Sequence, residues 1–110
     1  MNISLNPTDG IAVILIEGRL TATGAPRLRQ SVDEAVAAGL PRIVIDMSRL
    51  EFIDSSGIGA LIGGLKTARL ADGDLRIAAV PEAVRRVLKL TNLDRVLNAY
   101  PDAKSAFDGQ

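Results

Sequence analysis

The sequence contains neither cysteine nor histidine. Without cysteine, these 110 residues form no disulfide and offer no thiol nucleophile or thiolate metal ligand. Without histidine, the commonest general base and the commonest metal ligand are missing. Ser55 and Ser56 therefore have no histidine to activate them, and no motif brings a lysine beside them. We expect no enzymatic activity, no metal site and no cofactor.

The sequence also lacks net charge and long apolar runs. Thirteen basic residues balance thirteen acidic ones, so the electrostatic signature of nucleic-acid binding is absent. Arg85, Arg86 and Lys89 are interpreted as a solvated helix face. No apolar stretch approaches the length of a membrane span, and residues 1–4 lack the layout of a signal peptide. We expect a cytoplasmic protein that neither binds nucleic acid nor inserts into a membrane.

Aromatic residues are scarce, whereas 47% of the residues are hydrophobic. Since Phe52, Tyr100 and Phe107 are the three aromatic residues, the core must be built from Ile, Leu, Val and Ala. A chain of this length suits one domain. Because neither a linker nor an internal repeat divides the sequence, we expect a single domain over residues 1–110.

The hydrophobic pattern switches between the periods of strands and helices. Asp9-Gly10 separates the first two predicted strands and indicates a hairpin. After the hairpin, strands and helices alternate, which favours parallel strands with right-handed crossovers. We predict an α/β fold with a mostly parallel four- to five-stranded sheet, an N-terminal antiparallel hairpin strand and about four helices. The predicted strands are 3–5, 11–16, 43–45, 75–80 and 96–99, and the helices begin near residues 26, 55, 82 and 102.

The run from Phe52 to Gly59 joins a predicted strand to a helix start, and it holds two hydroxyls and an acid. Asp54 or a serine can cap the free N–H groups of the first helical turn, which leaves at least one hydroxyl near the surface. A catalytic pair of Asp54 with Asp46 is the weaker interpretation, because a helix cap and a strand-end acid explain both residues.

Four glycines in the same predicted helix each cost roughly 0.5–1 kcal/mol relative to alanine if exposed. Close packing of the helix on the sheet is one explanation. A smooth surface that a partner approaches closely is the other, and the two are compatible on different sides of the helix. The glycines are Gly57, Gly59, Gly63 and Gly64.

Thr21 and Thr23 lie in a second loop that follows a predicted strand. Because parallel strands end at the same edge of a sheet, we expect this loop on the same rim as Asp54, Ser55 and Ser56. Open α/β folds bind ligands at this rim. An ordinary role in the loop or in a helix cap is the alternative for both threonines.

These features resemble the STAS domain of bacterial anti-sigma factor antagonists over almost the whole chain. The resemblance rests on the opening hairpin, Gly18-x-Leu20, the strand 43–46, the run 52–59 and Leu90-x-x-Leu93. It implies partner switching: the unphosphorylated antagonist binds an anti-sigma factor that is also a serine kinase, phosphorylation ends this binding, and a serine phosphatase restores it.

The resemblance implies that Ser55 is the phosphorylated residue, a choice between Ser55 and Ser56 that the residues alone leave open. The implied partner-binding residues are Thr21, Thr23, Asp54, Ser56, Gly57 and Ile58. The family often has Gly-x-Leu-Asp before the first helix and a threonine three residues after that aspartate. Thr21 and Gly24 stand at these two positions. Since the family aspartate is associated with kinase contact, the identity of the kinase stays open.

Two other functions fit parts of the pattern. A STAS subunit of a transport system, similar to those of phospholipid ABC transporters, would use the same surface as a constitutive adaptor. A small enzyme that uses the serines of the rim is the other, and the missing histidine and cysteine argue against it.

Overall fold

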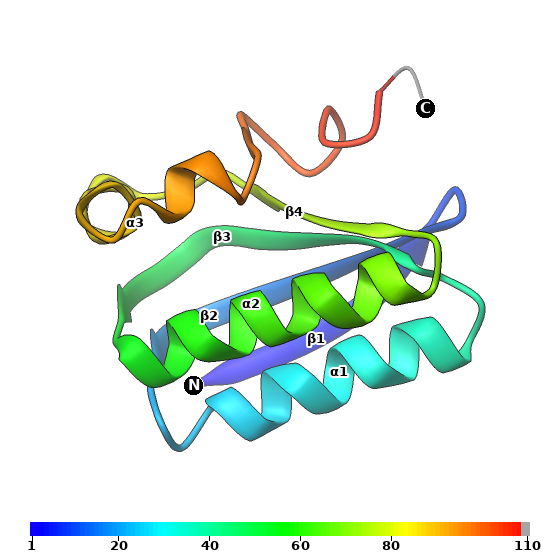
Figure 1. Cartoon of the computed structure of the whole chain (residues 1–110), viewed down its shortest axis with the longest axis horizontal. Coiled ribbons are helices and arrows are strands. Elements are labelled where there is room, and N and C mark those ends of the chain that lie inside the picture. Colours follow the sequence, from blue (N-terminus) through cyan, green and yellow to red (C-terminus); the bar gives the residue numbers. More distant parts are fainter. Residues whose placement is uncertain (109–110) are drawn as a thin grey trace.

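The strands form one five-stranded sheet, in agreement with the predicted α/β fold (Figure 1). The computed structural model describes residues 1–108. The first two strands pair antiparallel and all later neighbours pair parallel. In spatial order the strands are β1 (Asn2–Thr8), β2 (Ile11–Leu20), β3 (Arg42–Ile53), β4 (Asp74–Ala78) and β5 (Ala99–Tyr100).

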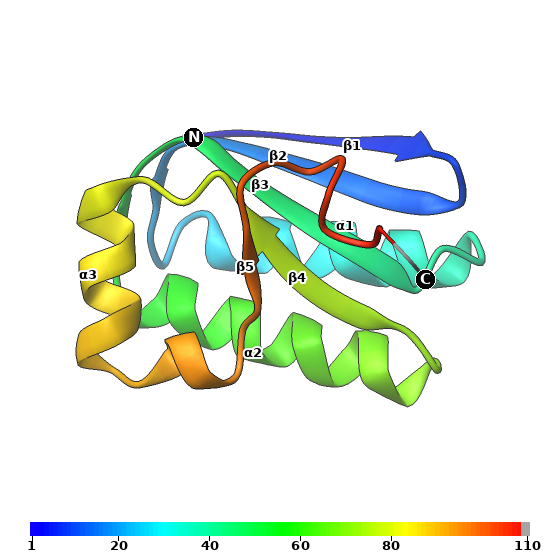
Figure 2. The same cartoon turned by 90° about the horizontal axis from the view of Figure 1, so that it is seen from above.

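Two long helices lie side by side on one face of the sheet (Figures 1 and 2). They are α1 (Ala25–Ala37), between β2 and β3, and α2 (Ser55–Leu70), between β3 and β4. Because the strand order advances in one direction, right-handed crossovers place both helices on the same face. A shorter helix, α3 (Glu82–Leu90), and a 3₁₀ turn, η1 (Leu93–Arg95), lie at the end of the sheet where β3 finishes.

The core between the sheet and the helices is aliphatic, as predicted from the shortage of aromatic residues. Alternate residues of β2 are fully buried, and they pair in register with buried residues of β3 such as Ile43 and Ile45. Leu28 and Val32 fill the core from α1, and Leu61 fills it from α2. Within residues 1–108 the buried set contains no polar or charged side chain.

A smaller apolar cluster lies on the opposite face of the sheet, where the chain after β5 crosses it. Ala106 and Phe107 pack on Val44 and Ala78. Arg76 fixes this segment, because its guanidinium stacks 4.2 Å from the Phe107 ring and donates a hydrogen bond of 2.7 Å to the Ala106 carbonyl.

The helix predicted over residues 102–107 is wrong, because this segment consists of turns. The Asp102 carboxylate accepts a hydrogen bond of 2.8 Å from the Ser105 N–H, which resembles a helix cap and lowers the pKa of Asp102. The chain then turns to place Ala106 and Phe107 on the sheet, so no helix continues. The last strand is also later and shorter than predicted, at residues 99–100 in place of 96–99.

Strand β3 runs eight residues beyond its predicted end at Ile45. Register shifts in its pairing with β2 space the buried residues Met47, Leu50 and Ile53 three apart, so the pattern does not alternate as a strand should. Asp46 is therefore not a strand-end acid. It lies inside β3, where its carboxylate accepts a hydrogen bond from the Ser48 N–H.

Glycine is required where α2 begins, because the helix contacts the end of β2 closely. A Cβ on Gly57 would lie 2.7 Å from the Leu20 carbonyl oxygen and 2.8 Å from an Ile53 side-chain carbon. A Cβ on Gly64 would lie 3.0 Å from Leu75. Gly59 and Gly63 instead lie beneath Arg29 of α1, with a Cβ clearance of 3.6 Å or more. Close packing therefore explains Gly57 and Gly64.

We predict that Gly57→Ala destabilises the protein by about 1–3 kcal/mol, because the new methyl group overlaps backbone that cannot yield easily. Gly59→Ala is the matched control in the same helix. It has room for the methyl group and should be neutral or stabilising by up to about 1 kcal/mol. Urea unfolding of both variants measures the difference, and equal stability of the two would contradict the assigned contact.

Candidate functional site

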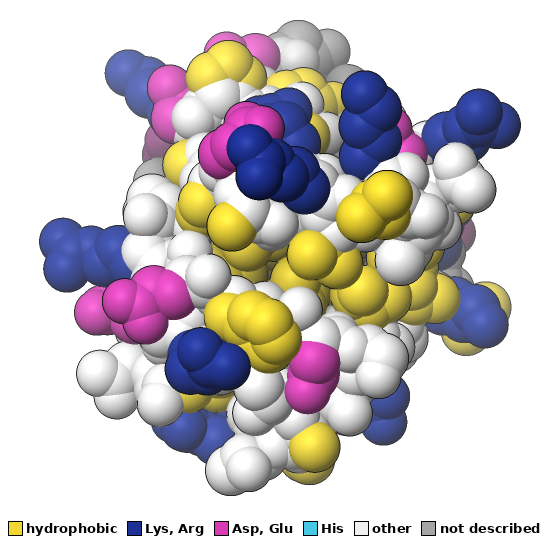
Figure 3. All heavy atoms as spheres, turned by 90° about the vertical axis from the view of Figure 1, so that its left-hand side faces the viewer, with side chains coloured by type: hydrophobic (Ala, Val, Ile, Leu, Met, Phe, Trp, Pro, Cys, Tyr) yellow, Lys and Arg dark blue, Asp and Glu magenta, His cyan; other side chains and the backbone are white. Residues whose placement is uncertain are grey.

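The loops after β2 and β3 begin at the same edge of the sheet, as predicted. Leu20 and Ile53 are register partners at the ends of these strands, and the Asp54 N–H donates a hydrogen bond of 3.2 Å to the Leu20 carbonyl. This edge, with the loop 21–24 and residues 54–56, is called the serine rim below. It lies at the end of the molecule that faces the viewer in Figure 3.

Asp54 is the residue that caps α2. Its backbone is extended, and its carboxylate accepts a hydrogen bond of 3.0 Å from the Gly57 N–H. Of the three candidates Asp54, Ser55 and Ser56, Asp54 is therefore the cap, and the two serine hydroxyls are not used to cap the helix. Within residues 1–108 neither hydroxyl has a hydrogen-bond partner. Ser55 is exposed and Ser56 is half-buried.

The position of Ser55 at the first turn of α2 favours a negative group there. The N–H groups at a helix start have no partner within the helix, and the helix dipole stabilises an anion by about 0.3–1 kcal/mol. The neighbouring Asp54 carboxylate opposes a second negative charge on Ser55. The fold itself is therefore nearly neutral toward a phosphate at this position.

The threonine loop has a structural role through its backbone. The Thr21 carbonyl accepts hydrogen bonds of 3.0 and 2.9 Å from the N–H groups of Gly24 and Ala25, which shapes the turn that leads into α1. Thr21 is half-buried and Thr23 is exposed. Gly24 is buried against the side chain of Met1, whose sulfur would lie 2.6 Å from a Cβ at this position.

The structure thus brings Thr21, Thr23, Asp54, Ser55 and Ser56 to one rim. The remaining two predicted contact residues lie differently. Gly57 is buried beneath the rim, so it positions the helix and presents no surface. Ile58 is half-buried and packs against the main core.

Sequence reasoning missed an exposed aromatic and cationic pair beside this rim. The Arg19 guanidinium stacks 4.3 Å from the centre of the Phe52 ring, and 39% of Phe52 remains exposed. Alternation in the sequence gave no signal for this pair, because the buried residues in this part of β3 are spaced by three. Figure 3 shows hydrophobic side chains gathered near the middle of this end of the molecule, with charged groups around them.

Within the described part of the chain, no group of acidic side chains is arranged to hold a metal ion. None of the helices in residues 1–108 has the length and hydropathy required to cross a membrane.

The fold and the rim define a small α/β domain with an unactivated, exposed serine at a capped helix start. The family model of the STAS domain matches residues 2–106, and the chain belongs to this family. The anti-sigma factor antagonists of the family are non-enzymatic regulatory proteins, which agrees with the expectation that the chain is not an enzyme.

Individual proteins show the same likeness. The anti-sigma F factor antagonist of Paenibacillus polymyxa is 25% identical, over 96% of this chain and 92% of that protein. The crystal structure of an anti-sigma factor antagonist from Mycobacterium paratuberculosis has a TM-score of 0.83 and 30% identity, covering 96% and 89% of the two chains. SpoIIAA in its unphosphorylated form has a TM-score of 0.82 at 22% identity, covering 97% and 94%, a likeness that shows the fold alone.

We predict that Asp54→Ala lowers the stability of the protein by about 1 kcal/mol, because it removes the acceptor for the Gly57 N–H. Asp54→Asn is the control, since asparagine caps helices about as well as aspartate. Thermal unfolding at neutral pH compares the two. A loss as large in Asp54→Asn as in Asp54→Ala would show that the charge, and not the cap, matters.

Proposed function

We propose that this protein is a cytoplasmic anti-sigma factor antagonist that binds an anti-sigma factor with serine-kinase activity. Phosphorylation of Ser55 ends the binding, and a serine phosphatase restores it. Residues 1–110 act as a single STAS domain in this cycle. The names of its relatives support the partner class, because proteins 25% and 30% identical along nearly the whole chain are described as anti-sigma factor antagonists.

The observation that carries the choice of Ser55 is its exposure at the capped start of α2. A kinase must reach the hydroxyl oxygen, and Ser55 is exposed whereas Ser56 is half-buried. Because the Asp54 carboxylate already accepts from the Gly57 N–H, the Ser55 hydroxyl is not needed to hold the helix. A phosphate can therefore be added without removing a structural hydrogen bond.

The proposed switch is electrostatic. A phosphoserine carries about −1.5 to −2 charges at neutral pH. The helix dipole stabilises this charge and the Asp54 carboxylate repels it. Because the two effects nearly cancel, the fold is retained. At an interface, however, a buried charge without a partner costs about 2–5 kcal/mol. A loss of about 3 kcal/mol corresponds to roughly a hundredfold weaker binding.

The proposed partner-binding surface is the serine rim, with Thr21, Thr23, Asp54 and Ser56 around Ser55. Gly57 and Ile58 contribute by fixing the helix start from below. The exposed ring of Phe52 and the stacked Arg19 extend this surface on the neighbouring strands. Large aromatic and arginine side chains of this kind commonly dominate the binding energy of an interface.

We predict that a cognate anti-sigma factor kinase incorporates one phosphate per chain, at Ser55. Mass spectrometry of the phosphorylated protein should place the group on this residue, Ser55→Ala should abolish incorporation, and Ser56→Ala should retain it. Phosphate on Ser56 of the native protein, or incorporation that survives in Ser55→Ala, would overturn the assignment.

We predict that Ser55→Asp weakens binding to the same partner by about tenfold to a hundredfold, while Ser55→Ala binds like the native protein. Calorimetry measures the affinities, and circular dichroism confirms that both variants are folded. If both folded variants bind equally, phosphorylation does not control the interface electrostatically. Constitutive co-purification with a transporter, insensitive to either substitution, would favour the adaptor function.

A further inference from the structure

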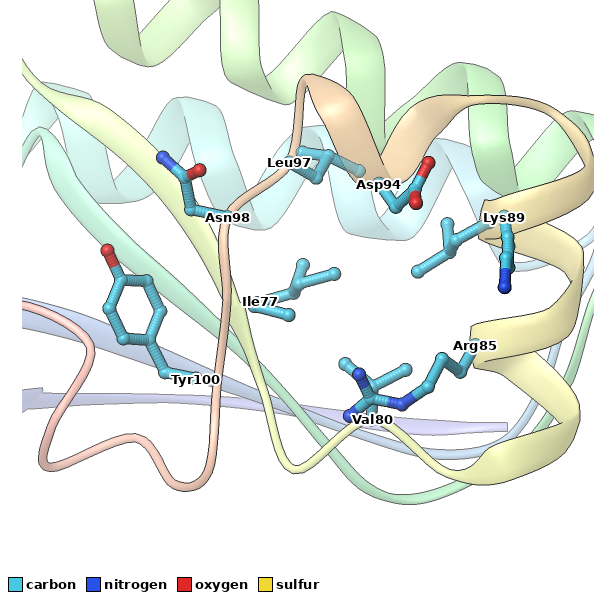
Figure 4. A pocket seen from close by; sticks show the side chains of 10 residues that line it. Ile77, Val80, Arg85, Lys89, Asp94, Leu97, Asn98 and Tyr100 are labelled. Carbon is cyan, nitrogen blue, oxygen red and sulfur yellow. The ribbon is translucent and has the colours of Figure 1, made fainter.

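A cavity of about 530 Å³ lies between α3, η1 and the strands β4 and β5 (Figure 4). Small-molecule sites in proteins typically occupy about 300–1,000 Å³. Four apolar residues lie beneath the cavity and are at most 9% exposed, whereas the charged and amide side chains at its walls are exposed. The apolar residues are Ile77, Val80, Leu88 and Leu97. The apolar surface that a ligand could reach is supplied by Val80 and by the aliphatic stems of Arg85 and Lys89.

The wall formed by α3 is basic. Arg85 and Lys89 are one helical turn apart and line the same cavity, and Figure 4 shows the Arg85 side chain reaching from the helix over Val80. Within residues 1–108 neither side chain forms an ion pair. The adjacent Arg86, in contrast, pairs with Glu82 at 3.5 Å and does not line the cavity.

The opposite wall of the cavity restricts the charge that a bound ligand can carry. Asp94 of η1 lines the cavity and is likewise without an ion pair in the described part of the chain, and Asn98 adds a neutral amide. Two cations and one carboxylate leave the cavity with a formal charge of plus one. A single negative charge is compensated there, whereas a second one would approach Asp94 without a partner.

We propose that this cavity binds a small organic monocarboxylate with an aromatic or branched aliphatic body. Arg85 and Lys89 bind the carboxylate, because hydrogen bonds from a charged donor to a carboxylate are stronger than those between neutral groups. The body lies over Val80 and the aliphatic stems of Arg85 and Lys89. This site does not depend on the proposed phosphorylation, because none of its residues belongs to the serine rim.

The test is a ¹H–¹⁵N NMR titration of the full-length protein with phenylacetate and, separately, 4-methylvalerate. Binding in the cavity should shift the amides of Leu88, Leu97 and Ala99 in a saturable manner. At pH 7, the neutral amide phenylacetamide and the dianion phenylmalonate should bind at least tenfold more weakly than phenylacetate. No saturable shift with either carboxylate, or equal affinity for phenylacetamide, would overturn the proposal.

Matched variants separate the cavity from general attraction to a basic helix. The double variant Arg85→Gln, Lys89→Gln should lose at least tenfold in affinity, whereas Arg86→Gln, which removes a charge from the same helix outside the cavity, should bind as the native protein does. Asp94→Asn should bind phenylmalonate more tightly than the native protein. An equal loss in Arg86→Gln would show adventitious binding only and refute the site.

Discussion

The position of the serine rim depends on one contact, in which Gly57 of α2 packs directly against the carbonyl oxygen of Leu20. The Asp54 N–H bonds to that same carbonyl, so β2, β3 and α2 meet at a single backbone oxygen. A side chain at residue 57 would separate them. The contact fixes where α2 begins, and it therefore fixes the direction in which Ser55 and Ser56 leave the sheet and the distance between the loops after β2 and β3.

The local roles at this helix start are divided between neighbours. Asp54 provides the cap, Gly57 provides the close approach, and Ser55 has neither task. The division matters for a residue proposed to be modified. If Ser55 were the cap, adding a phosphate would remove the acceptor that holds the first turn. Since Asp54 holds it, the chemistry of Ser55 can change while the helix stays in place.

The sequence was sufficient to predict the hairpin, the mostly parallel sheet and the shared rim, because hydrophobic periodicity and the rule on parallel strand ends carry that information. It failed where tertiary contacts override the local pattern. Register shifts space the buried residues of β3 three apart. The strand pattern was therefore not recognisable over its last eight residues, and Asp46 was wrongly predicted to lie at the end of the strand. The segment around Asp102 begins like a helix, but packing of Phe107 on the sheet decides its course. Without the resemblance, the sequence could not decide whether Ser55 or Ser56 is the better candidate for phosphorylation. The exposure of the two hydroxyls depends on how α2 packs on the sheet.

The charged groups around the serine rim explain why a phosphate would act on a partner more than on the fold. Arg19 is stacked on Phe52. Within residues 1–108 no basic side chain donates a hydrogen bond to the Ser55 hydroxyl or forms an ion pair with Asp54. Phosphoserine switches that reorganise a protein generally do so by forming new charge-assisted bonds to arginine. Because no ion pair or hydrogen bond in residues 1–108 joins a basic side chain to Ser55 or Asp54, a charge added at Ser55 would remain at the surface. A partner that binds at the proposed surface would have to desolvate this charge and would bear the cost, and this asymmetry is what a switch between two binding states requires.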